Sequence, residues 1–387
     1  MTRALIEGDG VMGRVISADN HLIDPRDLYA ERMPKQFRDR APRVLRGRDG
    51  GDGWSFDGKP PSRTFGLEAV AGQPDRAGKY KAAGMTWDEI LPGNYDGSAH
   101  LADMDRDGID GAVVYPMVAM AAYSMADAGF RVALMQTYND WLLGDFEAAD
   151  RTRLVGLCAL PVDEPIDVPV AELHRCVAKG ARAFFLPGSP QRPYWDPAYD
   201  PLWRAVEETG TVVSFHRNHG GRPRADEAPQ LDVPGFNVGG IAVRFFSAVT
   251  PFTYLIFTGV FERFPSLRIV AGEVNCGWMP FWLENMDQNY EQQKHWAKLP
   301  FDRPPSSYVG KNLFVTTLDD REGFAAMRRD PRLADAVLYS IDYPHSVTLW
   351  PNSARHIAAL TTGMDDAVKS KVLAGNADRL YRFGGRN

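Results

Sequence analysis

The stretch Val15-Ile16-Ser17-Ala18-Asp19-Asn20-His21 decides the fold, because it predicts a short apolar strand that ends in Asp-x-His. Side chains alternate between the two faces of an extended strand, so Asp19 and His21 are expected to point the same way. A carboxylate and an imidazole that converge at a buried strand end form half of a candidate metal site. Such a pair also occurs as capping or surface residues, so the rest of the chain has to supply the other ligands.

The composition is that of a globular protein and excludes several classes of function. The 387 residues are 44% hydrophobic and carry a formal net charge of -6 without a basic run, so nucleic acid is not an expected partner. The sequence has no apolar run long enough to span a bilayer, and residues 1–14 lack the apolar core of a signal peptide. The three cysteines, Cys158, Cys176 and Cys276, are far apart, which argues against a disulfide framework or structural zinc. These features predict a cytoplasmic protein.

From residue 100 onward, short apolar runs alternate with helical patterns, including a long apolar helix expected over 243–264. Seven such runs follow the opening strand, at 112–116, 154–161, 181–186, 211–216, 267–273, 312–317 and 336–342. They are continuously apolar, which is typical of parallel strands that are covered on both faces. Eight βα units predict one α/β domain over residues 1–387, a (β/α)8 barrel. An open doubly wound sheet is the alternative, but no Gly-x-Gly-x-x-Gly follows any strand.

The tract after the opening strand departs from this pattern. Residues 22–99 form a long polar insertion that is rich in glycine and proline. A small hairpin is expected around Trp54-Ser55-Phe56, with Asp57-Gly58 as its turn. Because the insertion directly follows a strand that carries candidate ligands, it is either a lid over a site or a peripheral subdomain.

Polar side chains gather at the predicted strand C-termini, where the active sites of such barrels lie. Four of the eight histidines and three carboxylates fall there. The residues at these ends are Asp19, His21, His216, Arg217, His219, Glu273, Asp342 and His345. Each has an alternative role when taken alone, as a turn cap, a core histidine or a residue that orients a ligand. Their gathering on one rim favours a metal site.

Several motifs spread along the chain reinforce this interpretation. They are Asp19-x-His21 with Asp24-Pro25, the segment Met104 to Asp110, His216, the segment Ser340 to His345, and the segment Asn376 to Tyr381. Together they resemble the amidohydrolase-2 family, which belongs to the metal-dependent amidohydrolase superfamily and includes the aminocarboxymuconate-semialdehyde decarboxylase group. The resemblance covers residues 15 to about 383. It implies a distorted (β/α)8 barrel whose metal is held by Asp19, His21, His216 and Asp342.

Two departures from the family pattern bear on the number of metal ions. Glu273 stands where many members have a histidine, and the strand at 182–187 offers no lysine to bridge two metals. One interpretation is a single Zn or Mn ion, which suits a decarboxylase or a simple hydrolase. The other adds His219, Glu273 and His345 to the four ligands. That larger set suits two Fe ions that activate O2, and it is similar to the di-iron hydroxylase branch of platensimycin-type diterpenoid pathways.

The main hypothesis from the sequence is therefore a non-haem di-iron monooxygenase. It would hydroxylate a bulky apolar carboxylic acid or its CoA thioester in secondary metabolism. The alternative is a non-oxidative decarboxylase or hydrolase of a small aromatic or enoic acid, with one metal ion as Lewis acid. In that alternative Asp342 moves the proton, assisted by His219 or His345, while Arg217 or Arg244 binds the substrate carboxylate.

Aromatic residues near the predicted rim are candidates for an apolar substrate pocket. They are Trp278, Phe281, Trp282, Phe245, Phe246 and Trp350. A non-catalytic barrel is not favoured, because neither Asp19 nor Asp342 is lost. The sequence leaves the oligomeric state open and is compatible with a homo-oligomer.

Overall fold

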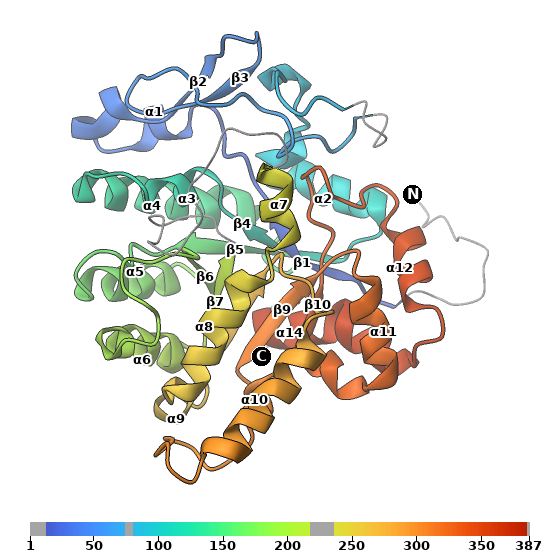
Figure 1. Ribbon diagram of the computed structural model, residues 1–387. Coiled ribbons are helices and arrows are strands. Elements are labelled where there is room, and N and C mark those ends of the chain that lie inside the picture. The colour runs from blue at the N-terminus through green and yellow to red at the C-terminus, as the bar shows by residue number, and fades with distance from the viewer. Residues whose placement is uncertain (1–12, 74–79, 217–235, 385–387) are drawn as a thin grey trace.

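An eight-stranded parallel sheet forms the centre of the molecule (Figure 1). The computed structural model describes residues 13–73, 80–216 and 236–384. Within these residues the strand order of the sheet follows the chain. The first and last strands also meet, because the backbone N–H of Asp342 donates to the Asp19 carbonyl (3.1 Å) and that of His21 donates to the Tyr343 carbonyl (2.7 Å). The expected distorted (β/α)8 barrel is confirmed.

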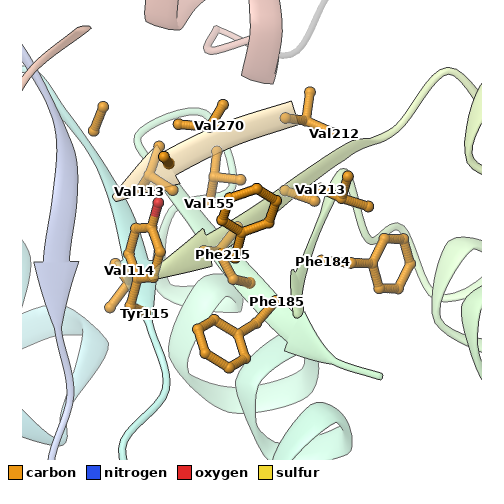
Figure 2. Packing of buried hydrophobic residues seen from close by; sticks show 14 of the residues in the cluster. Val113, Val114, Tyr115, Val155, Phe184, Phe185, Val212, Val213, Phe215 and Val270 are labelled. Atoms are coloured by element: carbon orange, nitrogen blue, oxygen red, sulfur yellow. The ribbon is translucent and has the colours of Figure 1, made fainter. Parts of the chain in front are cut away.

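Each strand of the sheet is buried along its whole length. The strands are β1 (Ile16–His21), β4 (Gly111–Tyr115), β5 (Leu154–Ala159), β6 (Ala183–Leu186), β7 (Val212–His216), β8 (Ile269–Gly272), β9 (Leu313–Thr317) and β10 (Val337–Tyr339). Figure 2 shows how side chains such as Val113, Phe185 and Val213 pack together. β-Branched and aromatic residues suit a pleated surface that is covered on both faces. The parallel register brings the C-termini of all eight strands to one rim.

α-Helices connect the strands and surround the barrel (Figure 1). They are α1 (Leu28–Arg32), α2 (Gly97–Asp107), α3 (Val118–Ala122), α4 (Ala128–Trp141), α5 (Asp167–Ala178), α6 (Asp200–Thr209), α7 (Phe236–Ala242), α8 (Phe246–Phe257), α9 (Val260–Arg263), α10 (Met279–Gln293), α11 (Arg321–Arg329), α12 (Ser353–Thr361), α13 (Asp366–Ser370) and α14 (Asn376–Tyr381). The single helix expected over 243–264 is wrong, because the chain divides there into α8 and α9. Gly259 has φ +73° between them, a left-handed conformation that ends an α-helix.

The insertion after β1 runs along one side of the barrel, in blue to cyan at the top of Figure 1. It contains an antiparallel hairpin of β2 (Arg43–Arg46) and β3 (Asp52–Ser55), so a hairpin does include Trp54. Its turn lies at residues 47–51, where the Gly47 N–H donates to the Gly51 carbonyl (2.7 Å). The turn expected at Asp57-Gly58 is therefore wrong as the hairpin connection. Both residues do have positive φ, but they follow β3.

Candidate metal centre

Two carboxylates and two imidazoles converge at the C-terminal rim of the barrel. Asp19 and His21 end β1, His216 ends β7, and Asp342 follows β10. The His21 Nε2 atom lies 3.3 Å from Asp19 Oδ1 and 3.2 Å from Asp342 Oδ1, and His216 Nε2 lies 3.7 Å from Asp19 Oδ1. All four side chains are at most 1% exposed. The chain thus brings together residues from the two ends and the middle of its sequence.

The close atoms of this cluster are not aligned as hydrogen bonds. Asp19 Oδ1, both ring nitrogens of His21 and both carboxylate oxygens of Asp342 lack a hydrogen-bond partner among the described residues. Burying such atoms without partners is costly, so a native site of this kind is expected to bind an ion. One ligand atom from each of Asp19, His21 and His216 lies within 4.8 Å of the others. Carboxylate oxygen and imidazole nitrogen are donors for zinc or manganese, and the residues therefore fit a divalent metal ion.

His345 extends the cluster on one side. Its Nδ1 atom lies 3.1 Å from Asp342 Oδ1. Its ring stacks on the ring of His21, with centroids 3.8 Å apart and planes inclined by 22°. The His345 side chain is 20% exposed, in contrast to the buried residues behind it. It is therefore the group of this cluster that a bound molecule reaches most directly.

Glu273 and Arg244 flank the cluster on the side of His216. Glu273 follows β8 with φ +57°, a conformation that costs a residue other than glycine about 1–3 kcal/mol. This backbone places Glu273 Oε2 3.4 Å from His216 Nε2 and Oε1 3.2 Å from Arg244 Nη1. Glu273 thus joins a guanidinium group to the metal-facing nitrogen of His216.

The electrostatics of the metal-free cluster centre on His21. Burial lowers the pKa of His21, but the adjacent Asp19 and Asp342 outweigh this effect and raise that pKa to about 10. Burial alone would raise the pKa of Asp342, whereas the neighbouring His345 and His21 hold it well below its usual range. Burial, followed by the charge of His21, lowers the pKa of His345. Without a metal ion, a proton on His21 thus balances the two carboxylates.

Two supporting groups are additional to the residues expected from the sequence. Thr316 on β9 donates its hydroxyl to Asp19 Oδ2 (2.9 Å) and accepts the backbone N–H of Glu273 (2.7 Å). His100 on α2 holds Asn20, with a distance of 3.1 Å between His100 Nε2 and Asn20 Nδ2. Burial lowers the pKa of His100 to about 4, so this ring is neutral at pH 7. Thr316 lies near the C-terminal end of a predicted strand, so the search for polar residues at strand ends could have found it. No sequence pattern pairs His100 with β1.

The structure places some of the other residues that the sequence suggested for the site, and others lie outside the part of the chain that it describes. His219 and Arg217 lie outside the described residues. Trp278 lies before α10, where its indole N–H donates to the carbonyls of Val274 and Asn275 and its ring packs 5.3 Å from that of Trp282. A pocket role for Phe281 is wrong, because its side chain points outward and is 76% exposed.

A metal-ligand set of this kind on the C-terminal rim of a (β/α)8 barrel defines the class of protein: a metal-dependent barrel enzyme. The model of the amidohydrolase family matches residues 87–383, which is most of the chain. The chain therefore belongs to the amidohydrolase family, and the resemblance inferred from its motifs is confirmed.

Relatives of known activity or structure cover most of the chain. It is 25% identical over 294 residues to the gamma-resorcylate decarboxylase of Polaromonas sp. (strain JS666), across 72% of this chain and 85% of that protein. The amidohydrolase map2389c of Mycobacterium avium subsp. paratuberculosis K-10 has a TM-score of 0.74 at 19% identity, covering 96% and 100% of the two chains. Dihydroxybenzoic acid decarboxylase from Polaromonas sp. JS666, with bound manganese and the inhibitor 2-nitroresorcinol, has a TM-score of 0.65 at 20% identity, covering 97% and 98%. At these identities the solved structures show the fold alone.

Across residues 13–73, 80–216 and 236–384, no helix is both long and apolar enough to cross a bilayer.

Proposed function

We propose that this protein is a non-oxidative decarboxylase of a small aromatic carboxylic acid, working with one Mn or Zn ion. The observation that carries the proposal is the buried cluster in which short contacts link Asp19, His21, His216 and Asp342. The relatives that are decarboxylases of hydroxybenzoic acids support this choice of reaction. They favour the non-oxidative alternative over the di-iron monooxygenase, which the larger set of candidate metal ligands in the sequence had suggested.

The position of Glu273 supports a single metal ion. A bridge through both carboxylate oxygens would need Glu273 Oε1, which Arg244 Nη1 contacts at 3.2 Å, while Oε2 lies 3.4 Å from His216 Nε2. The described residues form two compact groups of metal-binding side chains, and neither includes Glu273: one is Asp19, His21 and His216, the other His21, Asp342 and His345. The decarboxylase structure with bound manganese supports the choice of metal. O2 and a CoA thioester belong to the monooxygenase hypothesis and are not part of this proposal, and a homo-oligomer stays a prediction.

In the proposed mechanism the chain's own residues bind the acid and move one proton. When bound, the metal ion supplies a Lewis acid that polarises an oxygen of the substrate. Arg244, whose side chain is 14% exposed, offers a guanidinium for the carboxylate or a ring hydroxyl. Protonated His345, positioned by the Asp342 carboxylate 3.1 Å from its Nδ1 atom, delivers its proton to the ring carbon that carries the carboxylate. The bond to the carboxylate then breaks, its electrons restore the aromatic ring, and CO2 leaves.

The test combines metal analysis with CO2 release. Protein purified without chelators is expected to hold about one Mn or Zn per chain, because the four candidate ligands form one buried cluster. His21→Ala should lose the metal, whereas Glu273→Ala and the surface control His174→Ala should keep it. The wild-type protein is then screened with benzoic acids that carry one or two hydroxyl groups. Two irons per chain that are both lost in Glu273→Ala would restore the monooxygenase hypothesis. A fully loaded protein that releases no CO2 from any of these acids would overturn decarboxylation.

A further inference from the structure

A cavity of about 460 Å³ lies next to the metal centre, between the insertion and the loop after β10. The insertion contributes residues 70–73 and Tyr80, α2 contributes Arg106, and the loop contributes His345 to Asn352 in part. Two backbone hydrogen bonds fix these walls to each other. The Ala71 N–H donates to the Pro344 carbonyl (3.1 Å), and the Ser346 N–H donates to the Leu67 carbonyl (2.7 Å). The cavity is thus built by ordered backbone from two distant parts of the chain.

The walls of the cavity combine aromatic faces with a positive charge. Arg106 lies over the ring of Trp350, 4.9 Å from its centroid, and Tyr80 adds a second ring. Arg106 forms no ion pair within the part of the chain that the structure describes. None of the described lining residues is acidic, and the nearby Asp103, one turn earlier on α2, accepts a hydrogen bond from the Tyr343 hydroxyl. An aromatic carboxylate matches this lining, because its ring stacks on aromatic side chains and its charge pairs with arginine.

His345 connects this cavity with the metal centre. Its side chain lines the cavity, while its Nδ1 atom contacts Asp342 and its ring stacks on His21. A molecule in the cavity is therefore one side chain away from the candidate metal ligands. The cavity volume also lies in the range of pockets that enclose small organic ligands.

We infer that this cavity is an outer binding site for the aromatic acid, where Arg106 binds the carboxylate before the acid passes His345 to the metal centre. The choice of ligand rests on the proposed function. Arg106 then determines specificity for anionic ligands without touching the reacting atoms. Tyr80, which is partly exposed, provides the face on which the ring stacks, while the buried Trp350 holds Arg106 over its own ring.

Titration calorimetry with benzoate and its neutral analogue benzamide tests the inference on the full-length protein with its metal. We expect two benzoate sites per chain, one at the metal centre and one in the cavity. Arg106→Gln should weaken one site about tenfold or more and leave benzamide binding unchanged, since only benzoate loses a charge-assisted hydrogen bond. Tyr80→Leu should weaken both ligands at that same site.

The control is Arg204→Gln, because Arg204 also lies over an aromatic ring, that of Phe264 (5.8 Å), far from the cavity lining. It should leave both isotherms unchanged. The inference is overturned if wild-type protein has a single benzoate site, or if Arg106→Gln binds benzoate as the wild type does. These binding data need no turnover, so they stand apart from the CO2 assay. If the protein releases CO2 but Arg106→Gln has the same benzoate binding isotherm as the wild type, the outer site is refuted and the proposed function stands.

Discussion

The ring of His345 stacks on the ring of His21, with centroids 3.8 Å apart. The two histidines also share one carboxylate oxygen, since Asp342 Oδ1 lies 3.2 Å from His21 Nε2 and 3.1 Å from His345 Nδ1. His21 is at most 1% exposed, whereas His345 is 20% exposed. The stacked pair thus divides into an inner ring suited to a metal ion and an outer ring suited to a substrate.

His345→Phe tests this division of roles. Phenylalanine preserves the stacked ring but cannot transfer a proton, so we expect the metal content to stay near one ion per chain. We expect kcat for CO2 release to fall by about 10²- to 10⁴-fold, the usual contribution of a general acid or base. Metal analysis and steady-state kinetics on the same preparation measure both quantities. Loss of the metal together with activity would instead make His345 a ligand.

Arg244→Met tests the carboxylate-binding role of Arg244. We expect KM to rise by about tenfold or more, because a charge-assisted hydrogen bond to the substrate is lost. The metal content should not change, since Arg244 contacts Glu273 and, among the described residues, none of the four candidate ligands. Arg263→Met is a matched control, because Arg263 pairs with Asp200 away from the rim (3.0 Å) and should leave KM unchanged.

Removing Arg244 also takes away the guanidinium 3.2 Å from Glu273 Oε1, and less of the carboxylate charge that an anionic substrate meets is then compensated. The double variant Arg244→Met, Glu273→Gln separates the two effects. If KM returns to the wild-type value in the double variant, Arg244 only neutralises Glu273 and does not bind the substrate. A KM that stays high supports direct contact with the carboxylate.

Thr316→Val tests how the cluster is held in place. Valine has nearly the same shape, but it removes the donor to Asp19 Oδ2 and the acceptor for the Glu273 N–H. We expect the free energy of unfolding to fall by about 1–3 kcal/mol, as for other buried groups left unsatisfied. Metal affinity should fall by about 10- to 100-fold, as when partners of metal ligands are removed. Denaturant titration and competition with a metal indicator measure the two effects.

The neighbouring Thr317→Val is the control for that variant. Thr317 is equally buried but lies on the opposite face of β9, where its hydroxyl contacts Cys276 Sγ at 3.6 Å. Its metal affinity should equal that of the wild type. An equal loss of affinity in both variants would assign the effect to strand stability instead of to Asp19.

Much of the site was predictable from the sequence, because the active sites of such barrels lie at the C-terminal ends of the strands. Asp19, His216 and Asp342 each end a continuous apolar run, and a parallel barrel must bring those ends to one rim. Contacts that depend on side-chain direction were not predictable. Phe281, for example, looked like a pocket residue, but its position on α10 turns it to solvent.

The surroundings of Glu273 were also not predictable from the sequence. Glu273 is a potential ligand by residue type, and only its distance to Arg244 shows that one of its oxygens is engaged elsewhere. The link from His100 to Asn20 likewise joins α2 to β1 across 80 positions. No local pattern encodes such a pairing.

Asp24, three residues after His21, predicts a pH dependence of stability. It is buried, has φ +52°, and accepts a hydrogen bond from the Tyr29 hydroxyl (2.8 Å). Burial raises the pKa of Asp24 from 3.8 to about 7, and the Tyr29 hydrogen bond only partly offsets this. The folded protein therefore holds a proton on Asp24 that the unfolded chain releases near pH 4.

It follows that Asp24 is neutral in both states below pH 4 and costs stability as the pH rises toward 7. Asp24→Asn removes this charge, keeps an acceptor for Tyr29 and tolerates the positive φ. Relative to the wild type, the variant should gain about 1.4 kcal/mol of unfolding free energy per pH unit between pH 4 and 7, up to about 4 kcal/mol, and no more above pH 7. Urea unfolding of both proteins at half-unit pH intervals measures this difference. A difference that does not change with pH would mean that Asp24 stays ionised in the folded protein, and that its carboxylate is stabilised by more than the Tyr29 hydroxyl.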